Sequence, residues 1–265
     1  MFTFGGRIGL MDIVWLLLVS IAINVAGFLI AYLLRSDKLT DFSYGASFVV
    51  IGLIALLSND FSKARLLAFL LVTVWAVRLS GFLVIRILNV KKDRRFDGVR
   101  ENFWKFGAFW LGQGALAWII MLPVIFLISN NSSDDGLKLL AIVGILVFLA
   151  GLLIEAVADL QKFRFNKTPK NKGHWIATGL WKYSRHPNYF GEISVWIGAY
   201  LYCFSYLTAD KRLIGVASPL TIALMLVFVT GLPKLEKYAD QKWGQDPEYK
   251  KYKQGTSILI PLPPK

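Results

Sequence analysis

Residues 185–192, Arg-His-Pro-Asn-Tyr-Phe-Gly-Glu, carry more potential chemistry than any other stretch of the chain. They place a guanidinium, an imidazole, an amide, a phenol and a carboxyl group where a basic segment runs into an apolar one. Polar groups at the mouth of a membrane are costly to place unless they bind something. The stretch therefore indicates a membrane protein with a site for a polar ligand.

A second polar cluster ends an earlier apolar run. Glu155 and Asp159 are four residues apart, so both carboxylates lie on one face of a helix, and Gln161 and Arg164 follow them. Solvation of a helix end explains this cluster poorly, because acidic side chains at a helix C-terminus oppose the macrodipole. A third cluster, residues 234–240, is more typical of an amphipathic helix at the membrane surface.

A basic cluster at residues 91–97 follows an apolar run that contains Arg78 and Arg86, which are eight residues apart and lie on similar helical faces. Arginine inside a membrane normally faces a bundle interior or a wet cavity, although Arg86 could also extend its side chain to the interface. Basic side chains suit phosphate oxygens, and carboxylates suit ribose hydroxyls. The clusters therefore predict a pocket for a phosphorylated nucleotide or, equally, for a phospholipid headgroup.

The residue types exclude several other sites. The single cysteine, Cys203, excludes a disulfide or a CxxC redox pair within one chain. His174 and His186 lie in one loop without HxxxH or HExxH spacing, so we expect no metal. The chain has neither a Rossmann glycine fingerprint nor a P-loop. Its net charge of +13 lies in short segments between apolar runs, which favours the positive-inside rule over binding of nucleic acid.

The elements that must position these groups are membrane-spanning helices. The chain is 55% hydrophobic, and apolar runs of about 20 residues, the length that crosses a bilayer, recur along it. We therefore predict an all-α polytopic membrane protein with seven transmembrane helices. The predicted spans are residues 13–34, 40–58, 66–88, 103–128, 137–158, 189–206 and 213–232.

The distribution of basic residues predicts the orientation. Lysine and arginine are concentrated in residues 90–102, in residues 159–188 and in the tail after Leu232, and seven spans place these three segments on one face. The positive-inside rule makes that face cytoplasmic, giving an N-out, C-in topology. We expect an integral membrane protein whose three basic segments and polar clusters face the cytoplasm.

Residues 179–192, Gly-Leu-Trp-Lys-Tyr-Ser-Arg-His-Pro-Asn-Tyr-Phe-Gly-Glu, resemble the signature of the steroid 5α-reductase superfamily. The resemblance is greatest to its bacterial branch of small seven-helix proteins, known only as a domain of unknown function. It continues through residues 78–81, 93–96, 158–161, 231–236 and 249–264. It implies a helical bundle open to the cytoplasm and NADPH bound among the last helices and loops. Hydride would pass to the β-carbon of an enone while an acid polarises the carbonyl oxygen.

The resemblance also implies roles for single residues. Asp159 would contact the nucleotide with Glu155 nearby, and Asn188, Tyr189 and Glu192 would hold the nicotinamide and ribose end. The cofactor-binding residues that we expect are Asn89, Lys92, Arg94, Arg95, Glu155, Asp159, Arg164, Tyr183, Arg185, His186, Asn188, Tyr189, Glu192 and Glu236. We expect one integral-membrane domain, residues 1–265, with its substrate side in residues 1–130 and its cofactor side in residues 131–265.

The substrate half departs from the family pattern. The steroid enzymes place a Gln-Glu pair early in the second helix and a tyrosine in the third, whereas here the second span begins Thr-Asp-Phe-Ser-Tyr at residue 40. Asp41 could replace the glutamate and Tyr44 could supply a phenol, and Arg78 lies near the place of the tyrosine. We expect these three residues to be catalytic on a steroid-like or other membrane lipid. The alternative role for Asp41 is the N-cap of its helix, shared with Ser43.

Two other classes remain open. The isoprenylcysteine carboxyl methyltransferase group shares the Arg-His-Pro-x-Tyr-x-Gly element and binds S-adenosylmethionine, but its members are usually smaller, with fewer spans. Residues 93–96 and 159–161 fit the reductase branch better. A non-enzymatic lipid-binding membrane protein would explain the spans but not the cluster around Arg185.

Overall fold

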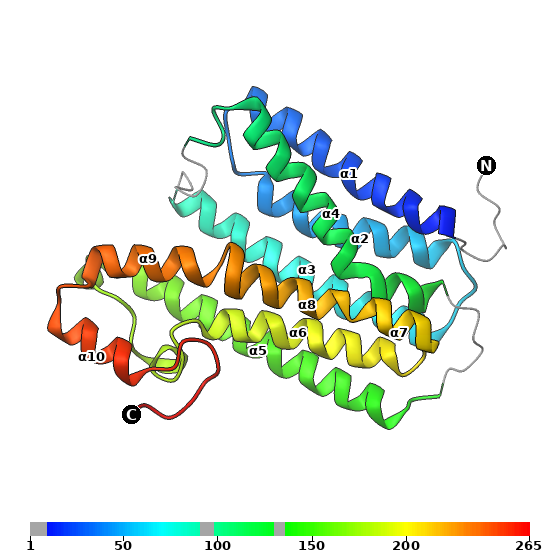
Figure 1. Ribbon diagram of the computed structural model, residues 1–265. Coiled ribbons are helices and arrows are strands. Elements are labelled where there is room, and N and C mark those ends of the chain that lie inside the picture. The colour runs from blue at the N-terminus through cyan, green and yellow to red at the C-terminus, as the bar shows by residue number, and fades with distance from the viewer. Residues whose placement is uncertain (1–9, 91–97, 130–135) are drawn as a thin grey trace. The chain divides into compact units, whose positions relative to one another are not determined.

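The regular elements of the protein are helical throughout the part of the chain that the computed structural model describes, residues 10–90, 98–129 and 136–265 (Figure 1). The prediction of an all-α chain is confirmed for these residues. The α-helices are α1 Leu10–Leu33, α2 Thr40–Leu57, α3 Lys63–Val90, α4 Phe103–Ile128, α5 Leu139–Lys167, α6 Pro187–Phe204, α7 Ala209–Gly215, α8 Ala217–Leu224, α9 Leu232–Trp243 and α10 Pro247–Gly255. The short turns are η2 Pro169–Asn171, η3 Gly179–Lys182 and the π-helical η4 Met225–Val229.

Six helical segments of the described chain are long and apolar enough to cross a membrane. They are Asp12–Leu33, Thr40–Leu57, Lys63–Asn89, Phe103–Ile128, Leu139–Lys167 and Ala209–Trp243. These segments support an integral membrane protein. The predicted span at residues 189–206 does form a helix, α6, but α6 does not reach the hydropathy of the other six because polar residues such as Asn188 and Glu192 occupy its first turns. The count of seven spans stays a prediction.

The N-out, C-in orientation also stays a prediction. We expect a reporter that is active only in the cytoplasm to give a strong signal when it is fused after Lys265. The same reporter inserted between α4 and α5 should be inactive. Equal signals from the two fusions would contradict the predicted arrangement of the helices.

The described residues form two compact units. The first contains the described residues up to Ile142 together with Ala199–Ser218, and the second contains Val143–Gly198 and Pro219–Lys265. In the first unit, α1, α2 and α4 pack together through buried side-chain hydrogen bonds. The Nε2 of Gln113 donates to Asn24 Oδ1 at 2.9 Å and to the carbonyl of Thr40 at 3.0 Å, and Asn24 Nδ2 donates to Ser47 Oγ at 2.9 Å. Such bonds fix the rotation of helices whose surroundings are apolar.

A buried ion pair joins two connections of the first unit. Asp37 lies between α1 and α2, and Arg100 lies shortly before α4. The Nη1 of Arg100 is 3.1 Å from Asp37 Oδ2, and the two side chains are only 5% and 3% exposed. The segments that enter α2 and α4 are therefore held together by opposite charges removed from solvent.

In the second unit, the backbones of α5 and α6 approach closely at glycines. A Cβ atom on Gly191 would lie 2.6 Å from the backbone nitrogen of Glu155, and one on Gly151 would lie 2.7 Å from the carbonyl oxygen of Gly191. Only residues without a side chain permit this approach. The contact fixes the register between the two helices and sets the polar first turns of α6 against the carboxylates of α5.

Candidate functional site

An amide and a carboxylate meet where α5 and α6 contact each other. The Nδ2 of Asn188, in the first turn of α6, donates a hydrogen bond to Asp159 Oδ1 at 3.2 Å. Glu155 lies one helical turn before Asp159 on α5, against Gly191, and its side chain is buried. The structure thus brings together three of the predicted cofactor residues, Glu155, Asp159 and Asn188. A carboxylate has about four lone-pair sites, so the Asp159 carboxylate can also accept from ligand hydroxyls.

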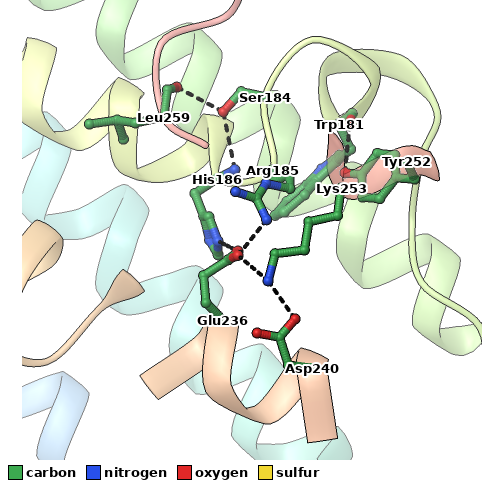
Figure 2. Close-up of polar contacts among 9 residues, drawn as sticks. All are labelled: Trp181, Ser184, Arg185, His186, Glu236, Asp240, Tyr252, Lys253 and Leu259. Atoms are coloured by element: carbon green, nitrogen blue, oxygen red, sulfur yellow. Dashed lines mark hydrogen bonds and ion pairs between the residues drawn. The ribbon is translucent and has the colours of Figure 1, made fainter. Parts of the chain in front are cut away.

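Arg185 and His186 both donate to one carboxylate, that of Glu236 on α9 (Figure 2). The Nη1 of Arg185 donates to Oε2, and His186 Nε2 lies 2.7 Å from Oε1. Lys253, on α10, places its Nζ 3.6 Å from Oε2 and also pairs with Asp240. The structure therefore brings together three predicted cofactor residues, because Arg185 and His186 each form a hydrogen bond with Glu236.

The π-helical turn η4 and Gly231 position α9. The N–H of Thr230 donates to the carbonyl of Met225 at 2.8 Å, a bond spanning five residues, and α9 begins immediately afterwards. A Cβ atom on Gly231 would lie 2.8 Å from Cε2 of Tyr189, so this ring packs directly on the backbone. The same ring stacks on His186, with centroids 5.6 Å apart and planes 18° apart. The turn and the glycine therefore place α9 against the start of α6.

The C-terminal tail pairs with the segment that enters α6. Ser184 and Ser257 form a parallel β-bridge, and the N–H of Arg185 donates to the carbonyl of Ser257 at 2.8 Å. The N–H of Leu262 donates to the carbonyl of Tyr183 at 3.0 Å. Ser184 Oγ donates to the carbonyl of Leu259 at 2.7 Å (Figure 2). In Figure 1 the chain accordingly turns back after α10 toward this segment.

Burial lowers the pKa of His186 below its ordinary value, and although the hydrogen bond to Glu236 opposes this shift, the charges of Lys162 and Arg185 add to it. Within the part of the chain that the structure describes, Nδ1 of His186 is buried without a hydrogen-bond partner. A proton on Nδ1 would therefore be a buried donor without an acceptor. The imidazole is accordingly neutral at neutral pH, with its hydrogen on Nε2, as the bond to Glu236 requires.

The neutral His186 predicts how stability depends on pH. Because the folded pKa lies below the unfolded value of 6.5, the unfolded chain binds more protons below that pH. We therefore expect the melting temperature to fall as the pH drops below about 6.5. His186→Gln keeps a side chain that can donate to Glu236 and should flatten this part of the profile. Parallel profiles for both proteins would show that another group titrates.

The other predicted cofactor residues are more scattered. Arg164 and Tyr183 are exposed, and Glu192 is partly buried in the second turn of α6. Asn89 belongs to the first unit, where its exposed Nδ2 donates to the carbonyl of Ile85 at 2.7 Å. Lys92, Arg94 and Arg95 lie outside the described residues.

The three predicted catalytic residues belong to the first unit. The carboxylate of Asp41 pairs with Arg86, with 3.5 Å between Oδ2 and Nη2 and both side chains partly exposed. Tyr44 packs its ring edge-on against Phe48, and Arg78 is partly buried on α3. The alternative role of Asp41 as an N-cap is wrong, because α2 begins at Thr40 with Leu39 at the cap position.

Residues 27–256 match the family described as "Protein of unknown function (DUF1295)". The chain belongs to the DUF1295 family. This family lies in the steroid 5α-reductase-like group, which confirms the resemblance at that level.

The DUF1295 chain is also similar to a fungal protein, "Probable O-methyltransferase ustE" of Ustilaginoidea virens. The two are 33% identical over 99 residues, which cover 34% of this chain and 35% of that protein. The chain thus matches only about a third of its curated relative's length. No solved structure matches the chain.

Two lysines of this DUF1295 protein belong to the site but do not stand out in the sequence. Lys162, on α5, places its Nζ 4.5 Å from the centre of the Trp181 ring, and Lys253 reaches Glu236 from α10. Lys162 lies outside the motifs, and Lys253 lies within residues 249–264 without being singled out there. In a chain with 30 lysines and arginines the residue type alone carries no signal. No group of three or more His, Cys, Asp or Glu side chains that could hold a metal occurs among the described residues.

Proposed function

We propose that this DUF1295 protein is an NADPH-dependent reductase that saturates the conjugated C=C bond of a steroid-like or other lipid enone in the membrane. The observation that carries the proposal is the hydrogen-bonded pair of Asp159 and Asn188 beside buried Glu155. We also infer that this polar end of α5 and α6 faces the cytoplasm, at the bacterial inner membrane.

The charges near this pair favour an anionic nucleotide. Carboxylate and amide groups suit the hydroxyls of a ribose, and the cations of Lys162 and Arg185 lie close enough to His186 to affect its ionisation. NADPH offers ribose hydroxyls and several anionic phosphate oxygens, whereas S-adenosylmethionine has one ribose and a cationic sulfonium. The net charge of +13 would also concentrate an anionic ligand near the protein.

The predicted cofactor-binding and catalytic residues would have separate tasks. Asp159 and Asn188 would bind and orient the ribose and nicotinamide end, while the Tyr189 ring, fixed between His186 and Gly231, would limit its movement. Bound NADPH would supply the hydride. As negative charge develops on the enone oxygen, a hydrogen-bond donor aimed at it would lower the barrier. The predicted catalytic residues supply the candidates for that donor: Tyr44, Arg78, and Arg86 paired with Asp41.

Binding of NADPH should raise the melting temperature of the detergent-purified protein, because a ligand that binds only the native state stabilises it. At a concentration of about 100 times Kd the expected gain is about 2.7 kcal/mol. Asp159→Ala and Asn188→Ala should each remove most of this gain. Glu248→Ala, which removes an exposed carboxylate on α10, is the matched control and should respond like the wild type.

The similarity to a protein named as a probable O-methyltransferase favours one alternative, a membrane methyltransferase. In that case S-adenosylmethionine would raise the melting temperature and NADPH would not. A response to neither ligand would contradict both enzyme proposals and favour a lipid-binding protein without catalysis.

A further inference from the structure

We propose that Glu236 and the C-terminal tail, residues 257–262, are positioning elements of the cofactor site, a role that rests on the proposed function. Glu236 holds the side chains of Arg185 and His186, and the tail holds the backbone immediately before them. Together they fix the entry into α6, so that Asn188 meets Asp159 in one geometry.

The side-chain contacts involve a single carboxylate, that of Glu236, which accepts a hydrogen bond on each of its two oxygens. Arg185 donates to one oxygen and His186 to the other, and the two donor side chains are only 12% and 6% exposed. Loss of the carboxylate would leave two buried donors without an acceptor, which is more costly than the loss of an exposed hydrogen bond. Arg185 and His186 could then find other acceptors only if the backbone that carries them moved. Glu236 therefore constrains residues that precede Asn188 by no more than three positions.

The backbone part is a set of three contacts from consecutive residues. The carbonyl of Tyr183, the hydroxyl of Ser184 and the N–H of Arg185 bond to Leu262, Leu259 and Ser257, respectively. Ser184 Oγ also accepts from the N–H of His186 at 3.1 Å. A β-type pairing of this kind sets a register, because a slip by one residue reverses the direction of every side chain. The tail thus decides which side chains of this segment point toward Glu236.

The position of Arg185 and His186 affects α6 because this helix starts at Pro187, directly after His186. A change in the direction of this entry would rotate the first turn of α6 and separate Asn188 from Asp159. Small displacements of positioning groups can weaken function by about 10²-fold. The segment from α9 to the tail is therefore required for ligand binding without needing to touch the ligand.

Hydrogen exchange of the ligand-free protein in detergent tests directly whether Glu236 and the tail hold the segment that enters α6. We compare the wild type with Glu236→Ala, with Glu236→Gln, which keeps the side-chain size, and with a chain that ends at Thr256. The control is Glu248→Gln, which alters an exposed acidic residue on α10. Peptides covering residues 183–190 should exchange at least about tenfold faster in Glu236→Ala and in the truncated chain. They should be unchanged in the control.

Ligand affinity is the second measurement. The Kd for NADPH should rise at least about tenfold in Glu236→Ala and in the truncated chain, and less in Glu236→Gln, which retains an acceptor oxygen. Unchanged exchange in residues 183–190, or unchanged affinity in Glu236→Ala, would overturn the proposal. If the truncated chain does not fold, Glu236→Gln and Ser184→Ala decide the outcome.

The two proposals can fail separately. A wild type that binds S-adenosylmethionine instead of NADPH would overturn the reductase, and the same variants would then be measured with S-adenosylmethionine. A wild type that binds neither would overturn the cofactor site and the role of Glu236 with it, even if the exchange data show that the loop depends on Glu236.

Discussion

Replacement of Asp37 by alanine is expected to lower the free energy of unfolding by about 3–5 kcal/mol. The guanidinium of Arg100 is only 5% exposed and lies 3.1 Å from this carboxylate. Alanine would remove the carboxylate nearest to this buried guanidinium, and breaking a buried ion pair by removing one member is strongly destabilising. Denaturant or thermal unfolding of the purified protein in detergent measures the loss.

Two further variants separate loss of the ion pair from loss of an acidic residue in general. Asp37→Leu combined with Arg100→Met replaces both members of the pair by apolar side chains and should recover most of the stability, since neither member is left behind without the other. Asp60→Ala changes an exposed aspartate at another connection and should shift stability by no more than about 0.5 kcal/mol. Equal losses in Asp37→Ala and in the double variant would contradict the role of the pair.

Asp41→Asn is expected to lower NADPH oxidation by lipid enones at least about tenfold, because it removes the carboxylate that holds the Arg86 guanidinium, and losing a positioned donor to a developing oxyanion typically costs about 10²–10³ in rate. This prediction rests on the proposed reductase activity. Asparagine has nearly the same size, and Asp41 is not the N-cap of α2, so folding and NADPH binding should be retained. The measurement is the steady-state rate with a panel of conjugated lipid ketones.

The variant Arg86→Gln distinguishes two possible roles of Asp41. The Asp41 carboxylate lies 3.5 Å from the guanidinium and can hold Arg86 as the donor. Asp41 could donate to the substrate itself only in its protonated form, which would give up the charge pairing with Arg86. If it holds Arg86, Arg86→Gln should reduce turnover as much as Asp41→Asn does. If Asp41 acts directly, the loss in Arg86→Gln should be clearly smaller. Unchanged turnover in Asp41→Asn would remove Asp41 from the mechanism and leave Tyr44 and Arg78.

The sequence by itself determined that the chain is helical and where most of its long helices lie. Predicted spans at residues 13–34 and 66–88 correspond to α1 and α3, and the span predicted at residues 103–128 has the bounds of α4. This succeeds because a helix in a bilayer satisfies its backbone hydrogen bonds within itself, so the length of an apolar run is sufficient information. The sequence also predicts that Glu155 and Asp159 lie on the same side of their helix, since they are four residues apart.

The partners of the polar side chains were decided only by the tertiary structure. Glu236 lies fifty residues after His186, and nothing in their spacing indicates that they share a hydrogen bond. The same is true of Asp37 with Arg100 and of Asn24 with Gln113. Such pairs depend on the rotation and register of packed helices, which here follow from glycine contacts, the π-helical turn and the returning tail. Helical periodicity shows which face of a helix is polar, but not which other segment that face meets.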